Sequence, residues 1–309
     1  MSSLIEQAAQ RLEQLRHAGV VIPETPQTVA APAVAEPNGH SAAAALAEPL
    51  ALPAKPVMSS RQVELNLEAL AAAGIVTPNA PRSHTADQYR VIKRPLIANA
   101  MGKGASLLRH GNLIMVTSAL AGEGKTYTSV NLAMSIATEL DNTVMLVDAD
   151  VARPSILRTL GLPPSGGLLD LLEGKADIPS VLLRTSIEKL TVLPSGTPHP
   201  RATELLASDA MRALLDDMAQ RYPDRIIIFD SPPLLLTTES RVLAAQMGQV
   251  VMVVQAEQTL RADVQRALAT IDACPVRLML LNRSRVHSVG GYGEGHGYGY
   301  GYGGEQPAS

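Results

Sequence analysis

Six short apolar runs alternate with helical patterns between about residues 85 and 286. The runs are rich in β-branched residues and apolar almost throughout, as parallel strands are when both of their faces are buried. Helical periodicity lies between them, over 125–140, 202–222 and 261–273. This alternation predicts βαβ units in one doubly wound, mainly parallel α/β sheet. The expected strands are NLIMVTS (112–118), TVMLVDAD (143–150), KLTVLPS (189–195), RIIIFDSPP (225–233), QVVMVVQ (249–255) and VRLMLLN (276–282).

The segments that flank this region have different patterns. Apolar residues at helical spacing predict a short helical element in 1–26. Segment 27–58 is dominated by Ala and Pro and favours an extended, disordered linker, because repeated prolines exclude a long helix. The last part of the chain, 287–309, is rich in Gly and Tyr, cannot bury a core and is expected to be a disordered tail.

A repeat links the first helical element to a second copy in 59–84. RLEQLRHAGVVIPETP (11–26) returns as NLEALAAAGIVTPNAP (66–81). Each copy has the pattern of a helix that ends at Gly, followed by an extended segment that ends at Pro. Two interpretations stay open: two surface helices of similar composition, or a duplicated docking element for a partner or a neighbouring subunit. The second of these is our hypothesis.

Composition narrows the class of protein. Of the 309 residues, 46% are hydrophobic but only 3% are aromatic, so the core must be aliphatic. The formal charge of −3 argues against nucleic-acid binding, which usually goes with a positive excess. A single cysteine, Cys274, excludes an intrachain disulfide and a Cys-rich metal site. The sequence has no apolar run of membrane-spanning length and no signal-peptide pattern, so we expect a soluble cytoplasmic protein.

The loop after the first predicted strand has phosphate-binding chemistry. ALAGEGKT (119–126) lies between that strand and a predicted helix and matches a P-loop with Ala in place of the first glycine. Small residues let backbone N–H groups converge on a phosphate, and the helix N-terminus adds positive potential. Lys125 is expected to reach the β- and γ-phosphates, and the Thr126 hydroxyl to ligate Mg²⁺. The expected nucleotide contacts are Ala121, Gly122, Glu123, Gly124, Lys125, Thr126 and Tyr127.

Three aspartates end two further strands. Asp148 and Asp150 close the second strand, and Asp230 closes the fourth. In an open α/β sheet the ligand lies at the carboxyl ends of the strands, so all three are expected to converge on the loop that holds Lys125. We expect Asp230 to hold the metal directly or through water, with Asp148 as a further metal contact. Either Asp148 or Asp150 is expected to orient or deprotonate an attacking hydroxyl.

Together these motifs resemble the bacterial P-loop tyrosine kinases over about residues 87–282. Within that family the chain is most similar to the tyrosine autokinases of exosortase-associated exopolysaccharide loci, through QYRVIKRPLIANA, DADVARPS and GTPHPRATELLAS. The resemblance implies ATP and Mg²⁺ as cofactors, and control of polysaccharide chain length, polymerisation and export. It also implies a membrane-embedded activator of the chain-length-determinant type that recruits the chain to the inner membrane face. A homo-oligomeric ring and a cognate tyrosine phosphatase are further implied partners.

The resemblance assigns roles to further residues. Asn282, at the end of the last strand, matches the position where relatives contact adenine. Asp87, Arg90 and Lys93 resemble the acidic and basic helix positions that contact the neighbouring subunit in relatives, with Lys in a place where Arg is usual.

The tail carries the expected phosphoacceptors. Tyrosines in a Gly-rich segment can enter an active site in extended form with little steric obstruction. The expected acceptors are Tyr292, Tyr298, Tyr300 and Tyr302.

Two alternatives to a kinase are consistent with a P-loop. One is a partitioning or positioning ATPase, although such proteins carry a lysine where this chain has Leu120 and have no need of a tyrosine cluster. The other is an assembly subunit that binds ATP without transferring phosphate.

Overall fold

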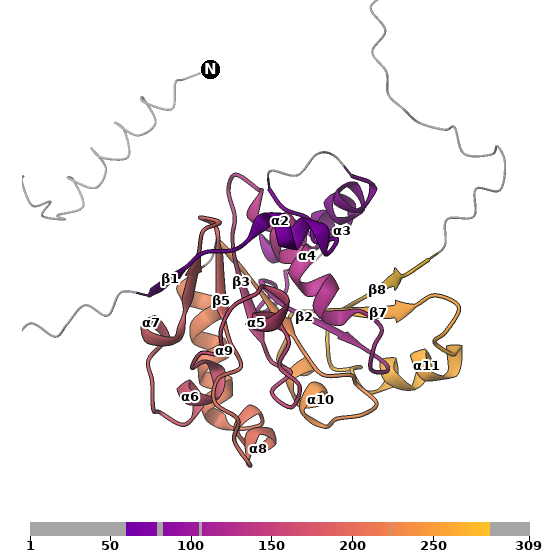
Figure 1. Cartoon of the computed structure of the whole chain (residues 1–309). Helices are drawn as coiled ribbons and strands as arrows, with labels where there is room; N and C mark the ends of the chain where they lie inside the picture. Colours follow the sequence, from indigo (N-terminus) through magenta and orange to yellow (C-terminus); the bar gives the residue numbers. More distant parts are fainter. Residues whose placement is uncertain (1–59, 79–82, 105–106, 223, 285–309) are drawn as a thin grey trace, which may run out of the picture. The chain divides into compact units, whose positions relative to one another are not determined.

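The fold is an eight-stranded sheet with helices on both faces (Figure 1). The computed structural model describes residues 60–78, 83–104, 107–222 and 224–284. The strands are β1 (Arg61–Val63), β2 (Leu113–Ser118), β3 (Thr143–Asp148), β4 (Leu183–Thr185), β5 (Leu190–Leu193), β6 (Arg225–Asp230), β7 (Gln249–Gln255) and β8 (Val276–Asn282). The helices are α2 (Leu67–Ala72), α3 (His84–Ala100), α4 (Lys125–Ala137), α5 (Ile156–Thr159), α6 (Leu168–Leu172), α7 (Ile178–Val181), α8 (Ala202–Leu206), α9 (Asp209–Arg221), α10 (Glu239–Ala244) and α11 (Arg261–Ala269).

The strand order β1-β4-β5-β3-β6-β2-β7-β8 confirms the predicted doubly wound α/β sheet. All neighbouring strands are parallel except β4 and β5, which run antiparallel. All six predicted strands are present. Two three-residue strands, β1 and β4, were not predicted, because a run that short has no measurable periodicity.

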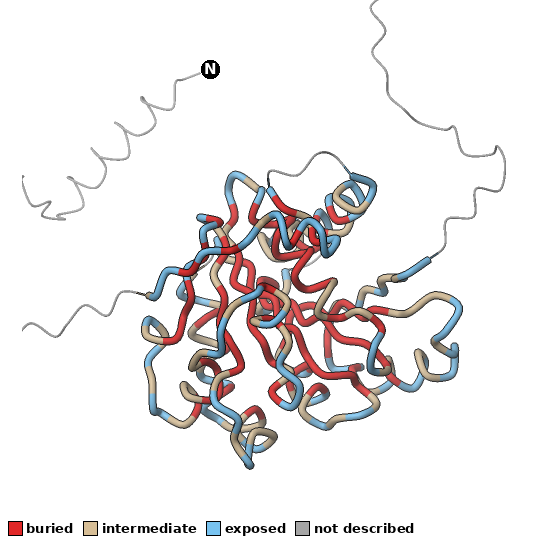
Figure 2. The backbone as a smooth tube through the Cα atoms, viewed as in Figure 1, coloured by how far each residue is buried: buried red, intermediate tan, exposed pale blue. Residues whose placement is uncertain are grey.

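Alternate residues of each central strand face two separate cores. In β3, Met145 and Val147 pack with α6, α8, α9, α10 and α11, whereas Val144 and Leu146 pack with α2, α3 and α4. Side chains that alternate along a strand supply both cores, so the central strands are buried throughout (Figure 2). This explains why their sequences are continuously apolar.

The long helix predicted over 202–222 is two helices. Helix α8 ends at Leu206, and α9 starts after Ser208, whose hydroxyl accepts a hydrogen bond from the Met211 N–H at 3.2 Å. A serine that caps the start of a helix in this way marks a break between two helices. The apolar residues keep their helical spacing across the break, so the spacing alone does not reveal it.

The second copy of the repeat is built into the same sheet and core as the region after it. Strand β1 pairs with β4, and α2 buries Leu70 against the α3–α4 side of the sheet. Its helix ends before Gly74, which has a φ of +79°, as the repeat pattern predicts. The first copy (1–26), the Ala/Pro linker (27–58) and the tail (287–309) lie outside the described residues. In the part of the chain that the structure describes, no helix is long and apolar enough to cross a membrane.

Candidate active site

The loop between β2 and α4 has the backbone of a phosphate-binding loop. Gly122 and Gly124 have φ values of +84° and +96°, a conformation that favours glycine. Helix α4 begins directly after Gly124, and no described side chain caps its first turn. Its first N–H groups therefore point into the loop, where an anion would accept their hydrogen bonds. The strand–loop–helix context expected for the P-loop is present.

Glu123 supports this loop from inside. Its side chain is 2% exposed, and its Oε2 accepts a hydrogen bond from the Leu120 N–H at 2.6 Å. Its Oε1 accepts one from the hydroxyl of Thr259, which follows β7. Glu123 was predicted to contact the nucleotide; its carboxylate instead faces the protein, so only its backbone can serve that purpose.

Asn282 attaches the end of β8 to the same loop. Its Nδ2 donates to the Glu123 carbonyl at 2.8 Å, and its Oδ1 accepts from the Arg283 N–H at 2.9 Å. A Cβ added at Gly124 would lie 2.2 Å from that Nδ2, so the close approach requires glycine. The expected contact between Asn282 and adenine stays a prediction.

Thr126, Asp148 and Asp230 come together at the carboxyl end of the central strands. Asp148 and Asp230 are register partners on the neighbouring strands β3 and β6. The Thr126 hydroxyl donates to Asp230 Oδ2 at 2.6 Å and lies 2.7 Å from the hydroxyl of Ser155. The other Asp230 oxygen accepts from Ser129 at 3.0 Å.

Burial raises the pKa values of both carboxyls. Complete burial and the nearby Asp148 raise the pKa of Asp230 to about 7, although Thr126 and Ser129 donate to it. Burial also raises the pKa of Asp148 to about 6, against the opposite effect of backbone N–H groups of Ile156 and Ser155. Two neighbouring buried carboxylates are unfavourable as long as no cation lies between them.

The arrangement fits a magnesium ion. Asp148 Oδ2 accepts from the N–H groups of Ser155 and Ile156 at 3.0 and 2.9 Å, but its Oδ1 is buried without a hydrogen-bond partner. A buried oxygen with no donor, beside a second carboxylate and a hydroxyl, is a hard-ligand set suited to Mg²⁺. Within the described residues, no group of three or more acidic, His or Cys side chains could hold a metal ion without further ligands.

Asp150 and Lys125 lie at the same edge of the sheet. Burial raises the pKa of Asp150, whereas the Arg153 N–H, the positive charge of Lys125 and the positive charge of Arg153 act in the opposite direction. Lys125 is 9% exposed, at the start of α4. The charge of Lys125 also lowers the pKa of Asp230, so Lys125 lies near Asp150 and Asp230.

Sequence reasoning missed two hydroxyls at this site. Ser155 contacts Thr126 and, through its N–H, Asp148; Ser129 contacts Asp230. Ser129 lies one helical turn after Lys125, so helix periodicity could have placed it beneath the loop. Ser155 had no comparable signal, because its position depends on the turn after β3.

The proposed subunit-contact residues divide into two groups. Asp87 and Arg90 are exposed and lie 2.6 Å apart as an ion pair. Lys93 is 3% exposed, and its ammonium donates to the Ser135 carbonyl at 2.5 Å and lies 2.6 Å from Glu139. Lys93 therefore binds within its own chain and is not available at the surface, which corrects that expectation.

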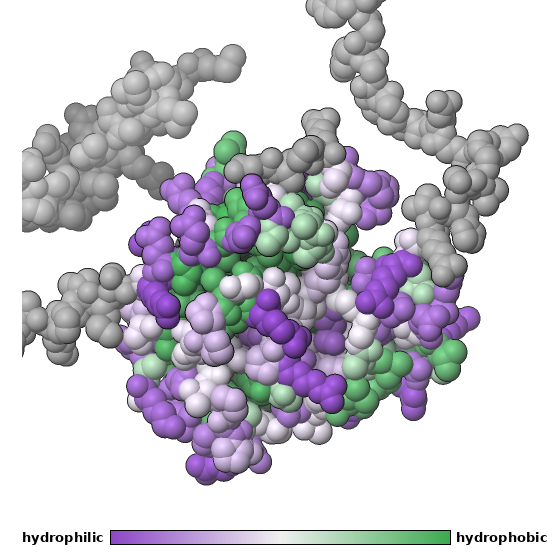
Figure 3. All heavy atoms as spheres, viewed as in Figure 1, coloured by the Kyte–Doolittle hydropathy of each residue, from purple (hydrophilic) through white to green (hydrophobic). Residues whose placement is uncertain are grey.

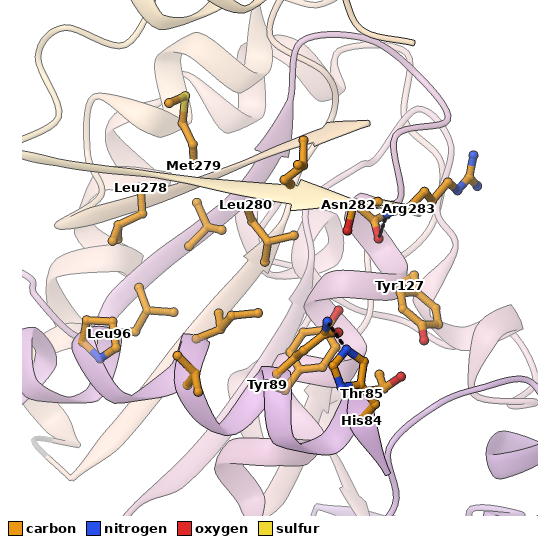
Figure 4. A pocket seen from close by; sticks show the side chains of 17 residues that line it. His84, Thr85, Tyr89, Leu96, Tyr127, Leu278, Met279, Leu280, Asn282 and Arg283 are labelled. Atoms are coloured by element: carbon orange, nitrogen blue, oxygen red, sulfur yellow. Dashed lines mark hydrogen bonds between the residues drawn. The ribbon is translucent and has the colours of Figure 1, made fainter. Parts of the chain in front are cut away.

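A groove of about 710 Å³ lies between α3 and β8, close to the site (Figure 4). Leu278 and Leu280 point into it from β8, and Tyr89 lines it from α3. Tyr127, in the first turn of α4, contributes to its lining and donates its hydroxyl to the Gly74 carbonyl at 2.8 Å. The side chain of Tyr127 thus connects the second repeat copy to α4, and its expected contact with the nucleotide stays a prediction. The four tail tyrosines lie outside the described residues.

Comparison with known proteins agrees with this geometry. The family described as AAA domain matches residues 111–280. The tyrosine-protein kinase YwqD of Bacillus subtilis is 28% identical over 221 residues, which cover 71% of this chain and 90% of YwqD. The putative tyrosine-protein kinase EpsB of Ralstonia nicotianae is 32% identical over 54% of this chain, and the match spans 22% of that longer protein. The crystal structure of the chimerical protein CapA2B2 superposes with a TM-score of 0.57 at 28% identity, over 72% of this chain and 93% of the other. The resemblance to bacterial tyrosine kinases is confirmed.

Proposed function

The chain belongs to the AAA-domain family, and from this and its site we propose that it is an ATP-dependent protein-tyrosine kinase that phosphorylates its own C-terminal tyrosines. Relatives named as tyrosine-protein kinases support the reaction class. The observation that carries the proposal is the unpartnered Asp148 Oδ1 beside Asp230 and Thr126, next to a P-loop. The proposed acceptors are Tyr292, Tyr298, Tyr300 and Tyr302.

The proposed roles follow from the contacts. The backbone N–H groups of 121–127 and the ammonium of Lys125 hold the phosphates. Thr126, Asp148 and Asp230 hold Mg²⁺, which when bound neutralises charge that develops on the transferred phosphate.

Asp148 or Asp150 orients the incoming tyrosine hydroxyl and accepts its proton. Burial raises the pKa of both, which makes each, when it is ionised, a stronger base than an exposed aspartate.

The wider role follows from the sequence resemblance. We propose that the chain regulates exopolysaccharide chain length, polymerisation and export, at the inner face of the cell membrane. A membrane-embedded activator recruits it there, subunits assemble into a homo-oligomeric ring, and a cognate phosphatase reverses the modification. The exposed pair Asp87 and Arg90 is the remaining candidate for a subunit contact.

The test is a phosphorylation assay on the purified full chain with Mg²⁺ and ATP. Phosphotyrosine is mapped by mass spectrometry, with Lys125→Met as the matched control, and ADP release is measured in the same samples. Phosphate on the tail tyrosines of the unsubstituted chain, absent from the control, is the expected result. ADP release without phosphotyrosine would instead identify a hydrolysing ATPase, and neither product would identify a passive nucleotide binder.

A further inference from the structure

Strand β8 leaves one edge of the sheet open. It pairs with β7 on one side, and within the described ranges no strand pairs with its other side. Its residues alternate in exposure: Leu278 and Leu280 are half-buried, whereas Met279 and Leu281 are 65% and 61% exposed. An open edge with apolar side chains is a template for a further strand, and proteins normally cover or charge such edges.

The two faces of β8 differ. Leu278 and Leu280 point toward α3 and the groove, and Met279 points to the opposite side (Figure 4). The space-filling view shows hydrophobic side chains at the surface on the side of the molecule where α11 lies (Figure 3). A strand added to this edge would therefore place every second side chain on Met279 and Leu281, and the others beside the groove.

The sequence of the tail has the same period. Tyr298-Gly299-Tyr300-Gly301-Tyr302-Gly303 alternates one large aromatic residue with glycine. In a strand, all three tyrosines would lie on one face and all three glycines on the other. Aromatic side chains are favoured in strands and pair well across them with aliphatic ones.

We propose that the open edge of β8 is a docking site for the chain's own tail, which adds residues 298–303 as an antiparallel strand. In this pairing Tyr300 covers Leu281 and Tyr302 covers Met279. The glycines face the groove side, where they leave room for the side chains of α3. Antiparallel pairing follows because the tail returns along the strand from which it leaves.

The connection is long enough for this return. The described chain ends at Ser284, just after β8, and Arg283 has a φ of +56°, which turns the chain away from the strand direction. About 14 residues join Ser284 to Tyr298 and can span up to about 45 Å, whereas a seven-residue strand is about 23 Å long.

The tether also favours the tail over other occupants. A segment joined to its site by a short linker has an effective concentration of about 1 mM, well above that of a second copy of the chain in solution. Alternate glycines make a weak strand, so the docked tail would exchange readily with the free one.

One consequence rests on the proposed kinase function. Tyrosines docked on β8 are withheld from an active site, and a phosphate on Tyr300 or Tyr302 would add about −1.5 to −2 charges next to apolar side chains. Phosphorylation would therefore prevent the tail from docking again.

Paired cysteines test the docking without ATP, so the result does not depend on kinase activity. The full chain, treated with a tyrosine phosphatase, carries Leu281→Cys with Tyr300→Cys, and the control carries Leu281→Cys with Gly301→Cys. Directly opposite side chains lie about 5 Å apart, within reach of a disulfide, whereas the control pair projects to opposite faces. The native Cys274 is buried and does not compete.

The expected result is an intramolecular disulfide that forms about tenfold faster in the Tyr300 pair than in the Gly301 pair, because only the former is held in register. Equal rates would show an undocked tail, and covalent dimers alone would show that a second copy is the occupant; either result overturns the proposal.

A second readout uses a surface charge. Leu281→Asp should expose the tail to chymotrypsin and raise the cleavage rate at its tyrosines several-fold, whereas Leu236→Asp, at a residue that is 59% exposed, should not. Met279→Asp repeats the test at a second position. Unchanged cleavage in both β8 variants would contradict docking.

Discussion

Asp230→Asn should stabilise the nucleotide-free chain while it removes function. The fully buried carboxyl of Asp230 has a pKa raised from 3.8 to about 7, chiefly by burial. The folded chain therefore holds more protons than the unfolded chain between these two pH values, and its unfolding free energy falls as pH rises through them. The pKa difference corresponds to a cost of at most about 4 kcal/mol above pH 7.

An asparagine can take over the existing contacts. Its Oδ1 can accept a hydrogen bond from Thr126, and its NH₂ can donate one to the Ser129 hydroxyl. The Ser129 hydroxyl can then donate to the Lys125 carbonyl, which lies 3.0 Å away in the unsubstituted chain. The variant removes the buried charge and keeps one hydrogen bond each to Thr126 and Ser129. The unfolding free energy of Asp230→Asn should exceed that of the unsubstituted chain by an amount that grows by about 2–3 kcal/mol between pH 5 and pH 8. The reason is that the aspartate loses its proton over this range, whereas an asparagine has none to lose.

Thermal unfolding at several pH values measures this difference in stability. It is followed by far-UV circular dichroism, because the chain contains no Trp for a fluorescence signal. Asp141→Asn, at an exposed position, is the control and should leave the pH dependence unchanged. Adding Mg²⁺ and ATP should raise the melting temperature of the unsubstituted chain but not of Asp230→Asn. A variant that is less stable at pH 8, or an advantage that does not change with pH, would refute the electrostatic reasoning.

Three other substitutions test neighbouring contacts. Gly124→Ala forces a Cβ within 2.2 Å of Asn282 Nδ2 and should weaken ATP binding at least about tenfold in calorimetry, more than Gly122→Ala, which meets open space. Tyr127→Phe deletes one hydrogen bond to the second repeat copy and should cost about 1 kcal/mol of unfolding free energy, with phosphorylation unchanged. Lys93→Met should lower unfolding free energy by about 1–3 kcal/mol without altering subunit number in light scattering; a loss of assembly at unchanged stability would restore its role as a subunit contact.

Much of the fold follows from local pattern. The central strands are buried on both faces and are therefore apolar over most of their length, a signal that survives in a single sequence. Strands β1 and β4 have no such signal, because each is three residues long and is defined by pairing with strands that are distant in the sequence or short themselves: β1 pairs with β4, and β4 pairs with β1 and β5. The break at Ser208 was visible in principle as a capping residue within a helical pattern.

The site was predictable where strand ends imply proximity. Asp148 and Asp230 could be brought together because parallel strands end at the same edge of a sheet. The inward position of Lys93 could not be predicted, because its partner Ser135 is 42 residues away on another helix. Glu123 shows the same limit: its residue type suits a loop exposed to ligand, and only the position of Thr259 reveals that it is buried.

Asn282 is the last residue of β8, and its side chain also supports the P-loop through the hydrogen bond to the Glu123 carbonyl. A chain that ends at Leu281 would lose the amide that supports the P-loop, although the strands from β1 to β7 would keep their sequence. A truncation at the end of the sheet is therefore expected to act on the P-loop, which lies more than 150 residues earlier in the chain.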